Sequence, residues 1–190
     1  MAERKVLIEV SARHLHLSQE HMMALFGPDS ELHIRKTISQ PGQFAAHEIV
    51  AVIGPKSILP VRVVGPIRSE TQVELTAGDC RALGIEVALR VSGTLDNTPG
   101  CMLEGPKGRV TLRQGVIVAQ RHLHVSPAQA ESLGLKHGDK VSIRTIGTRP
   151  VTFHDVFVRS RAGVDELSFM IDTDEANAAG LRGGEEGILV

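Results

Sequence analysis

Val6 to Ser18 reads VLIEVSARHLHLS, and Val116 to Ser126 reads VIVAQRHLHVS. In both stretches an apolar run ends in Arg-His-Leu-His, followed by an apolar residue and a serine. A pattern of this length that recurs in one chain indicates an internal repeat. We therefore predict that the chain consists of two duplicated halves.

Each copy continues into a similar cassette. Ser18 and Ser126 are suitable N-caps for a short helix, and Pro127 suits the first helical position. A polar turn and an alternating strand follow, at residues 32–35 in one copy and 141–144 in the other. Because looser versions of the cassette recur at 79–92 and 174–190, we predict four short helices that alternate with strands.

The remaining segments indicate the fold class. They are short, rich in valine and isoleucine, and bounded by glycine and proline, at residues 48–53, 60–64, 72–75 and 151–158. Many short strands with few helices favour two small barrels or sandwiches over a doubly wound sheet. We predict a mainly β protein with short helices (α+β), in which the turn-rich stretch 96–108 (DNTPGCMLEGPKG) connects the halves.

Composition excludes several classes of protein. The chain has 190 residues and is 42% hydrophobic, which is enough to bury a core and argues against disorder. Its 21 basic and 22 acidic residues nearly balance, so no strong field attracts nucleic acid or anionic lipid. With no Trp, no Tyr and five scattered Phe, little is available for stacking on bases.

The cysteines and the start of the chain bear on localisation. Cys80 and Cys101 lack CxxC spacing, so neither a disulfide framework nor a thiolate zinc site is indicated, and we expect both to be structural. The chain starts without a signal-type apolar segment and contains no apolar run long enough to span a bilayer. We expect a cytoplasmic protein with no nucleic-acid or membrane partner.

Two His-x-His pairs are the main candidates for chemistry. In a strand, residues i and i+2 project from one face, so His14 and His16 point together, as do His122 and His124. A single pair is more often incidental, but its recurrence in both repeats favours a metal site, and neutral imidazole suits zinc, cobalt, nickel or copper. The sequence alone does not rank the carboxylates that could complete such a site: Glu48, Glu74, Asp155, Asp172, Asp174 and Glu175.

Two arginines flank the Gly65-Pro66 break. Arg62 and Arg68 could each grip a phosphate with two parallel hydrogen bonds, although a solvated turn arginine is the commoner case. No Walker loop, dinucleotide glycine motif or Gly-x-Ser-x-Gly elbow is present.

The chain resembles the phosphate propanoyltransferases of propanediol-utilisation microcompartments, a phosphotransacylase family. The resemblance covers nearly the whole chain and is carried by SARHLHLS (11–18), GPIRSETQVEL (65–75), LRVSGTL (89–95), GPKG (105–108), GVIVAQRHLHVSPAQAESLG (115–134), VFVRS (156–160) and IDTDEANAAGL (171–181). It implies two helix-capped β-barrels, the first at 13–119 and the second at 1–12 plus 120–190 with the first strand exchanged onto it. The implied reaction converts an acyl-CoA and phosphate into an acyl phosphate and CoA at a two-zinc site where the barrels join.

The resemblance also implies roles for individual residues. One zinc would be held by His14, His16 and Glu74, and the other by His122, His124 and a histidine just before IDTDEAN. Arg68 matches the phosphate-binding arginine of the family. Coenzyme A contacts fall on the positions of Lys36, Arg62, Ser92 and Asn177.

One position departs from the family pattern. Met170 stands where the family has histidine, and a thioether suits copper(I) better than zinc, so the second metal loses a ligand. His154, on a neighbouring predicted strand, is a candidate to replace it. The departure keeps open a catalytically weak or inactive relative that binds CoA or serves in assembly. A third reading is a metal-dependent hydrolase built on the same histidines.

The short N-terminus and the exchanged strand lead to expectations about binding partners. Only residues 1–5 precede the first predicted strand, so we expect no amphipathic leader of the kind that targets family members into the shell. We expect a cytosolic enzyme, or one packaged through other microcompartment components. An exchanged strand also makes a homo-oligomer plausible.

Overall fold

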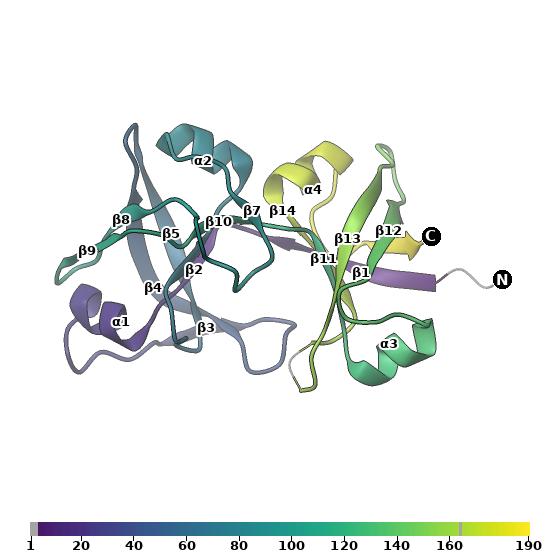
Figure 1. Ribbon diagram of the computed structural model, residues 1–190, viewed down its shortest axis with the longest axis horizontal. Coiled ribbons are helices and arrows are strands. Elements are labelled where there is room, and N and C mark those ends of the chain that lie inside the picture. Colours follow the sequence, from purple (N-terminus) through teal and green to yellow (C-terminus); the bar gives the residue numbers. More distant parts are fainter. Residues whose placement is uncertain (1–3, 164) are drawn as a thin grey trace. The chain divides into compact units, whose positions relative to one another are not determined.

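The computed structural model describes residues 4–163 and 165–190, and the chain divides into two compact units. The barrel unit comprises the chain up to Ala12, Ser39–Pro41 and Gln120–Val190, and the sheet unit comprises Arg13–Ile38 and Gly42–Ala119 (Figure 1). Residues 1–3, with which the predicted second domain begins, lie outside the described residues.

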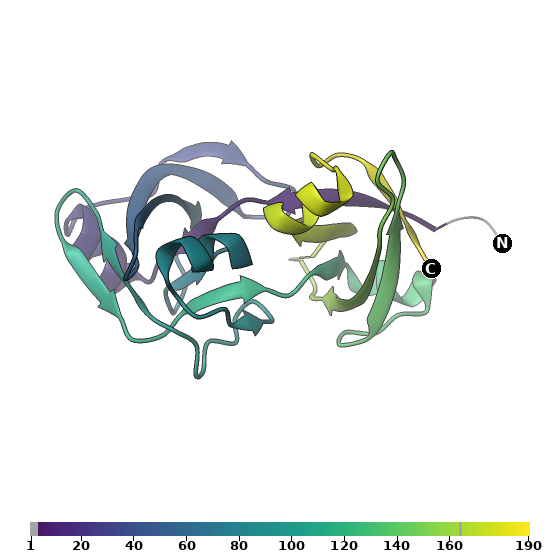
Figure 2. The same cartoon turned by 90° about the horizontal axis from the view of Figure 1, so that it is seen from above.

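The barrel unit is built on a closed barrel in the order β1-β14-β11-β13-β12-β15. Strand β1 runs parallel to β14 and antiparallel to β15, so the first strand of the chain joins strands from the other end of the sequence. In Figure 2 the yellow helix α4 lies against the purple β1. The elements are β1 (Arg4–Ser11), β11 (His122–Val125), α3 (Pro127–Leu133), β12 (Lys140–Thr145), β13 (Thr152–Ser160), β14 (Ser168–Asp172), α4 (Thr173–Ala179) and β15 (Glu186–Leu189).

Strand alternation divides the barrel unit into a core and an outer face. Leu123 and Val125 of β11 and Phe169 of β14 belong to the buried apolar core. The residues between them must point the other way, so His122 and His124 lie on the face of β11 that points away from this core, its outer face, where both are also buried.

Ser39–Pro41 belongs to the barrel unit, although the strands that flank it in sequence, β3 (Ile34–Thr37) and β4 (Phe44–Ile53), belong to the sheet unit. The Gln40 amide donates to Ser168 Oγ at 3.0 Å and accepts from the Glu166 backbone N–H at 3.2 Å. The Ser39 hydroxyl donates to Glu9 at 2.7 Å. These polar contacts, which no pattern in the sequence indicated, bind the segment to β1 and to the start of β14.

The sheet unit contains a nine-stranded sheet in the order β7-β10-β6-β2-β5-β4-β8-β9, with β3 paired to β4. Its core combines Leu15 and Leu17 with residues of every long strand and of both helices. The elements are β2 (His14–His16), α1 (Gln19–Phe26), β3 (Ile34–Thr37), β4 (Phe44–Ile53), β5 (Ile58–Gly65), β6 (Gln72–Glu74), α2 (Ala77–Leu83), β7 (Leu89–Arg90), β8 (Cys101–Glu104), β9 (Arg109–Leu112) and β10 (Val116–Ala119).

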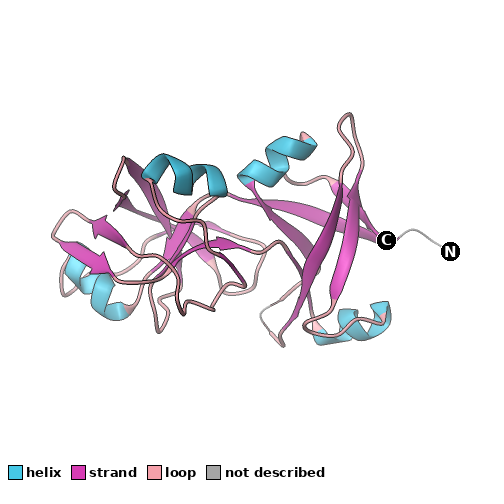
Figure 3. Cartoon of the chain, turned by 45° about the horizontal axis from the view of Figure 1, so that its top comes forward, coloured by secondary structure: helices cyan, strands magenta, loops and turns pink. Residues whose placement is uncertain are grey.

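The mainly β fold with four short helices is confirmed (Figure 3). One unit closes into a barrel, and the other curls as a sheet, in keeping with helix-capped β-barrels. Ser18 and Ser126 cap α1 and α3, Pro127 starts α3 as expected, and Thr76 and Asp172 cap the other two helices. None of α1 to α4, the helices of the described residues, is long and apolar enough to cross a membrane.

The prediction that residues 96–108 connect the halves is wrong. Cys101–Glu104 forms β8, which pairs with β4 and with β9, and the chain leaves the sheet unit for the last time after Ala119. Cys101 and Leu103 are buried while Met102 is exposed, so this stretch is an alternating strand. The glycines and prolines on either side of it hid a strand of only four residues.

Candidate functional site

The first histidine pair lies on β2, in the middle of the sheet unit. Leu15 points into the core, so His14 and His16 share the opposite face of the sheet. Strand β6 runs antiparallel beside β2 and puts Glu74 directly opposite His14. Directly opposed residues project from the same face, so this register brings a carboxylate to both imidazoles.

Distances in this group, which we call the first metal cluster (His14, His16 and Glu74), fit a divalent metal. His14 Nε2 lies 3.6 Å from one Glu74 oxygen, and His16 Nε2 lies 3.8 Å from the other. The three ligand atoms lie within 4.8 Å of one another. Metal–ligand bonds of about 2.0–2.1 Å in a tetrahedron separate neighbouring ligands by roughly 3.3 Å, so small adjustments would seat a zinc ion.

Hydrogen bonding orients His16 for this purpose. Its Nδ1 lies 2.8 Å from the backbone carbonyl of Val64, which can only accept, so Nδ1 carries the proton and Nε2 turns its lone pair toward Glu74. A backbone carbonyl in this position is a common orienting partner of metal-bound histidine.

The protonation states also suit ligands. Burial, helped by the charges of His14 and Arg68, lowers the pKa of His16 to about 3 and keeps the imidazole neutral. Burial alone would raise the pKa of Glu74, but His14, His16 and a hydrogen bond from Ser92 lower it to about 2. A neutral imidazole and an ionised carboxylate are the forms that bind a metal.

Polar side chains surround Glu74. Ser92 Oγ donates to Glu74 Oε1 at 2.9 Å, and the Gln72 amide donates to the same oxygen at 2.5 Å. Gln72 in turn accepts from the Gly93 backbone N–H at 2.7 Å. Ser92, expected to contact CoA, thus contacts a candidate metal ligand. Sequence reasoning missed Gln72, although its i, i+2 spacing from Glu74 on one strand could have indicated it.

Arg68 lies beside the first metal cluster. Its backbone N–H donates to Leu17 at 2.9 Å, and its position pairs with Ser18, the residue two places after His16. Its charge acts on both His16 and Glu74. A cavity of about 540 Å³ is lined by residues that adjoin Ser18 and Arg68 in the chain, among them Gln19 and Ile67. The structure therefore places the charge of Arg68 close to His16 and Glu74, while the cavity is lined by neighbouring residues of the chain and not by Arg68 itself.

The predicted CoA-contacting residues lie on different elements of the two units. Arg62 lies on β5, where its backbone position is opposite His14 of β2. Its guanidinium donates to the backbone carbonyls of Ala46 and His47 at 2.7 and 3.2 Å. Lys36 is exposed on β3. Asn177 is exposed on α4 of the barrel unit.

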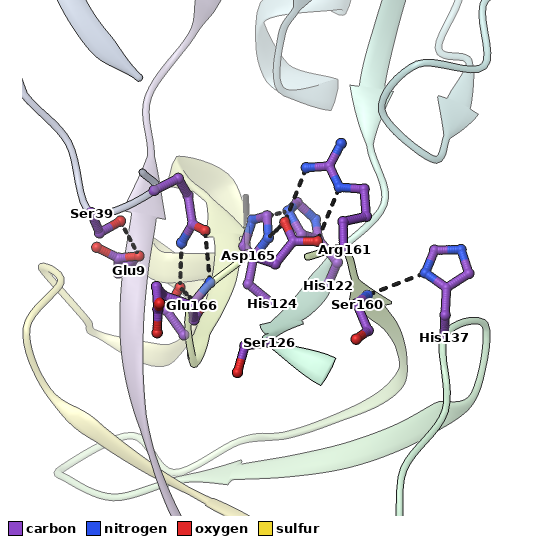
Figure 4. Close-up of polar contacts among 12 residues, drawn as sticks. Glu9, Ser39, His122, His124, Ser126, His137, Ser160, Arg161, Asp165 and Glu166 are labelled. Carbon is purple, nitrogen blue, oxygen red and sulfur yellow. Dashed lines mark hydrogen bonds and ion pairs between the residues drawn. The ribbon is translucent and has the colours of Figure 1, made fainter. Parts of the chain in front are cut away.

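The second histidine pair, His122 and His124, lies on the outer face of β11 in the barrel unit. The two Nε2 atoms face each other at 2.9 Å (Figure 4). Met170 of β14 is directly opposite His122, so its side chain lies on the same face as the pair. Phe169 and Ile171 on either side of it are in the core, and Met170 itself is half-buried.

His154 is not brought to this pair. Its Nδ1 lies 2.7 Å from Ser142 Oγ on the neighbouring strand. In the parallel pairing of β11 and β13, the partner of His122 is Phe157, three residues further along, a separation of about 10 Å at 3.3 Å per residue.

Most of the other candidate carboxylates have structural partners. Glu48 binds His33 at 2.8 Å, and Asp155 binds Lys140 at 3.2 Å. Asp172 and Glu175 form the capping box of α4. The carboxylate that does reach the second pair is Asp165, at 2.7 Å from His124 Nδ1, and sequence reasoning missed it.

The two cysteines are predicted to be unreactive in the folded protein. Both are buried, and burial raises the pKa of Cys101 to about 12. Since only the thiolate reacts, we expect no labelling by Ellman's reagent at pH 8 in the native chain and two labelled thiols per chain in denaturant. Rapid labelling of the native chain would contradict this, and would add a background to any assay of released CoA thiol.

Comparisons with known proteins agree on one family. The family model described as phosphate propanoyltransferase matches residues 7–182. Proteins named phosphate propanoyltransferase match from Rhodopseudomonas palustris (51% identity, covering 94% of this chain and 79% of the relative), Sebaldella termitidis (46%, 96% and 87%) and Listeria monocytogenes (43%, 100% and 89%).

Proposed function

The chain belongs to the phosphate propanoyltransferase family, and from this premise we propose that it transfers a short acyl group between coenzyme A and phosphate. An acyl-CoA and phosphate are converted to an acyl phosphate and free CoA, and the reverse. The acyl carbon exchanges a bond to sulfur for a bond to a phosphate oxygen, and the CoA thiolate leaves. The observation that carries the proposal is the first metal cluster beside Arg68, since the reaction needs an electrophile and an anchored phosphate.

In this proposal the first metal cluster holds a zinc ion that, when bound, supplies Lewis acidity toward the thioester carbonyl or the leaving thiolate. Arg68 binds the phosphate, aims one of its oxygens at the acyl carbon and offsets the negative charge that develops during attack. Phosphate is largely a dianion near neutral pH, so no protein base is required. Gln72 and Ser92 keep Glu74 oriented through the hydrogen bonds to Oε1.

The proposal extends to a second zinc at His122 and His124 and to coenzyme A contacts at Lys36, Arg62, Ser92 and Asn177. Met170 leaves that second site with two imidazoles. Self-association and packaging with microcompartment components are part of the same family-based proposal.

The first experiment measures the release of CoA thiol from propanoyl-CoA by zinc-loaded protein, with and without phosphate. We expect release that depends on phosphate, that is lost after treatment with a chelator, and that returns with zinc. Release without phosphate would mean that the chain is a hydrolase.

A catalytically weak relative that binds CoA is the second candidate, and Met170 is the observation that favours it. It predicts bound zinc and bound CoA with no release of thiol under either condition. The same assay, run beside calorimetric titration of CoA, therefore separates the two.

A further inference from the structure

Asp165 is the most deeply buried carboxylate near the second histidine pair. Its side chain is 0% exposed, and it lies in the loop between β13 and β14 of the barrel unit. Oδ1 is 2.7 Å from His124 Nδ1. Arg161 donates through Nε to Oδ2 and through Nη2 to Oδ1, both at 3.0 Å (Figure 4). Burying a carboxylate is costly unless it is paired, and here two partners compensate it.

These contacts determine which nitrogen of each imidazole carries the proton. A carboxylate gripped by a guanidinium fork accepts hydrogen bonds on both oxygens, so His124 Nδ1 is the donor to Asp165. His122 Nδ1 lies 2.8 Å from the backbone carbonyl of Gln120, which also only accepts. A neutral imidazole has one N–H, so both Nε2 atoms present lone pairs.

The two lone pairs face each other at 2.9 Å. Two acceptors at this distance repel unless a proton or a metal cation lies between or beside them. The Nδ1 partners therefore hold the pair in the orientation that a divalent transition metal would use.

We propose that Asp165, braced by Arg161, is a positioning residue that fixes His124 with Nε2 directed at a divalent transition metal such as zinc. A carboxylate behind a histidine ligand fixes its tautomer and increases its basicity. The stronger imidazole offsets part of what the site loses by having Met170 in place of a third histidine. This inference rests on the proposed function in one respect, namely that His122 and His124 hold a metal.

The test titrates zinc into metal-free protein that carries His14→Ala and His16→Ala. These two substitutions remove the imidazoles of the first metal cluster, so binding at the second pair is measured alone. In the Asp165→Asn variant the side chain has one acceptor oxygen in place of two. It therefore cannot accept hydrogen bonds from both Arg161 and His124 as the carboxylate does. We expect the zinc affinity of the pair to fall by about ten- to a hundredfold. The matched control is Asp155→Asn, which alters a 72% exposed carboxylate of the same unit and is expected to change nothing.

A second readout separates positioning from general loosening of the fold. Imidazole nitrogen NMR of the metal-free chain reports the tautomer directly. We expect His124 to be protonated at Nδ1 in the unaltered chain and to populate both tautomers in Asp165→Asn. If that variant does not fold, Arg161→Lys takes its place, because Arg161 is 39% exposed and lysine cannot form the fork. We expect it to lower the affinity by a smaller factor.

The His122→Ala variant distinguishes the two ways of failing. If it binds zinc as well as its parent, the pair holds no metal and the two-zinc proposal fails. If His122→Ala loses zinc while the Asp165 and Arg161 variants keep both the affinity and the Nδ1–H tautomer, the role of Asp165 is overturned.

Discussion

Replacing Arg68 by alanine is expected to lower the phosphate-dependent turnover of propanoyl-CoA by about a hundred- to a thousandfold, the usual cost of removing one preorganised group that stabilises developing negative charge. The fold and the zinc content are expected to persist. The hydrogen bond from Arg68 to Leu17 is made by the backbone, so it survives loss of the side chain. Steady-state assays at varied phosphate, with zinc analysis and thermal unfolding, check the result.

Two further variants calibrate this prediction. Arg68→Lys keeps the charge but loses the planar guanidinium, so its turnover should lie between that of Arg68→Ala and that of the unaltered chain. Arg109→Ala removes an exposed arginine of the same unit that pairs with Glu104, and its turnover should be unchanged. Normal turnover in Arg68→Ala would remove Arg68 from the mechanism.

Substituting Met170 by histidine is expected to tighten zinc binding at the second pair by roughly a hundred- to a thousandfold. Four-ligand zinc sites bind with about 10–16 kcal/mol, or about 2.5–4 kcal/mol for each ligand, and each 1.4 kcal/mol is a factor of ten. Because residue 170 is directly opposite His122 on the outer face of the barrel, an imidazole there can join the pair. Zinc stoichiometry and competition with a chelating dye give the affinity, and turnover is expected to rise with it.

The matched control is Met170→Leu, which keeps the size and apolar character of methionine without a ligand atom and should not bind more zinc. A gain in zinc without a gain in turnover would favour the inactive relative. No gain in either quantity would mean that the site is complete without the histidine, and the inactive-relative reading would lose its main support.

The sequence by itself determined the elements that follow from local rules. Strand alternation put His14 with His16 and His122 with His124 on single faces, away from Leu15 and Leu123. Serine caps predicted the starts of α1 and α3. Such features depend on neighbours a few residues apart. Motifs spread over nearly the whole chain indicated the family.

Only the tertiary structure decided which distant groups meet the histidines. From the residues alone Glu74 was one of six equivalent carboxylates, and the antiparallel register of β2 and β6 brings it to His14 and His16. Asp165, 41 positions from His124, reaches it through a loop that no periodicity marks. Strand pairing and loop paths are non-local, because their free energy comes from burying one segment against another. Local propensity therefore specifies which way a side chain points, and long-range packing selects its partner.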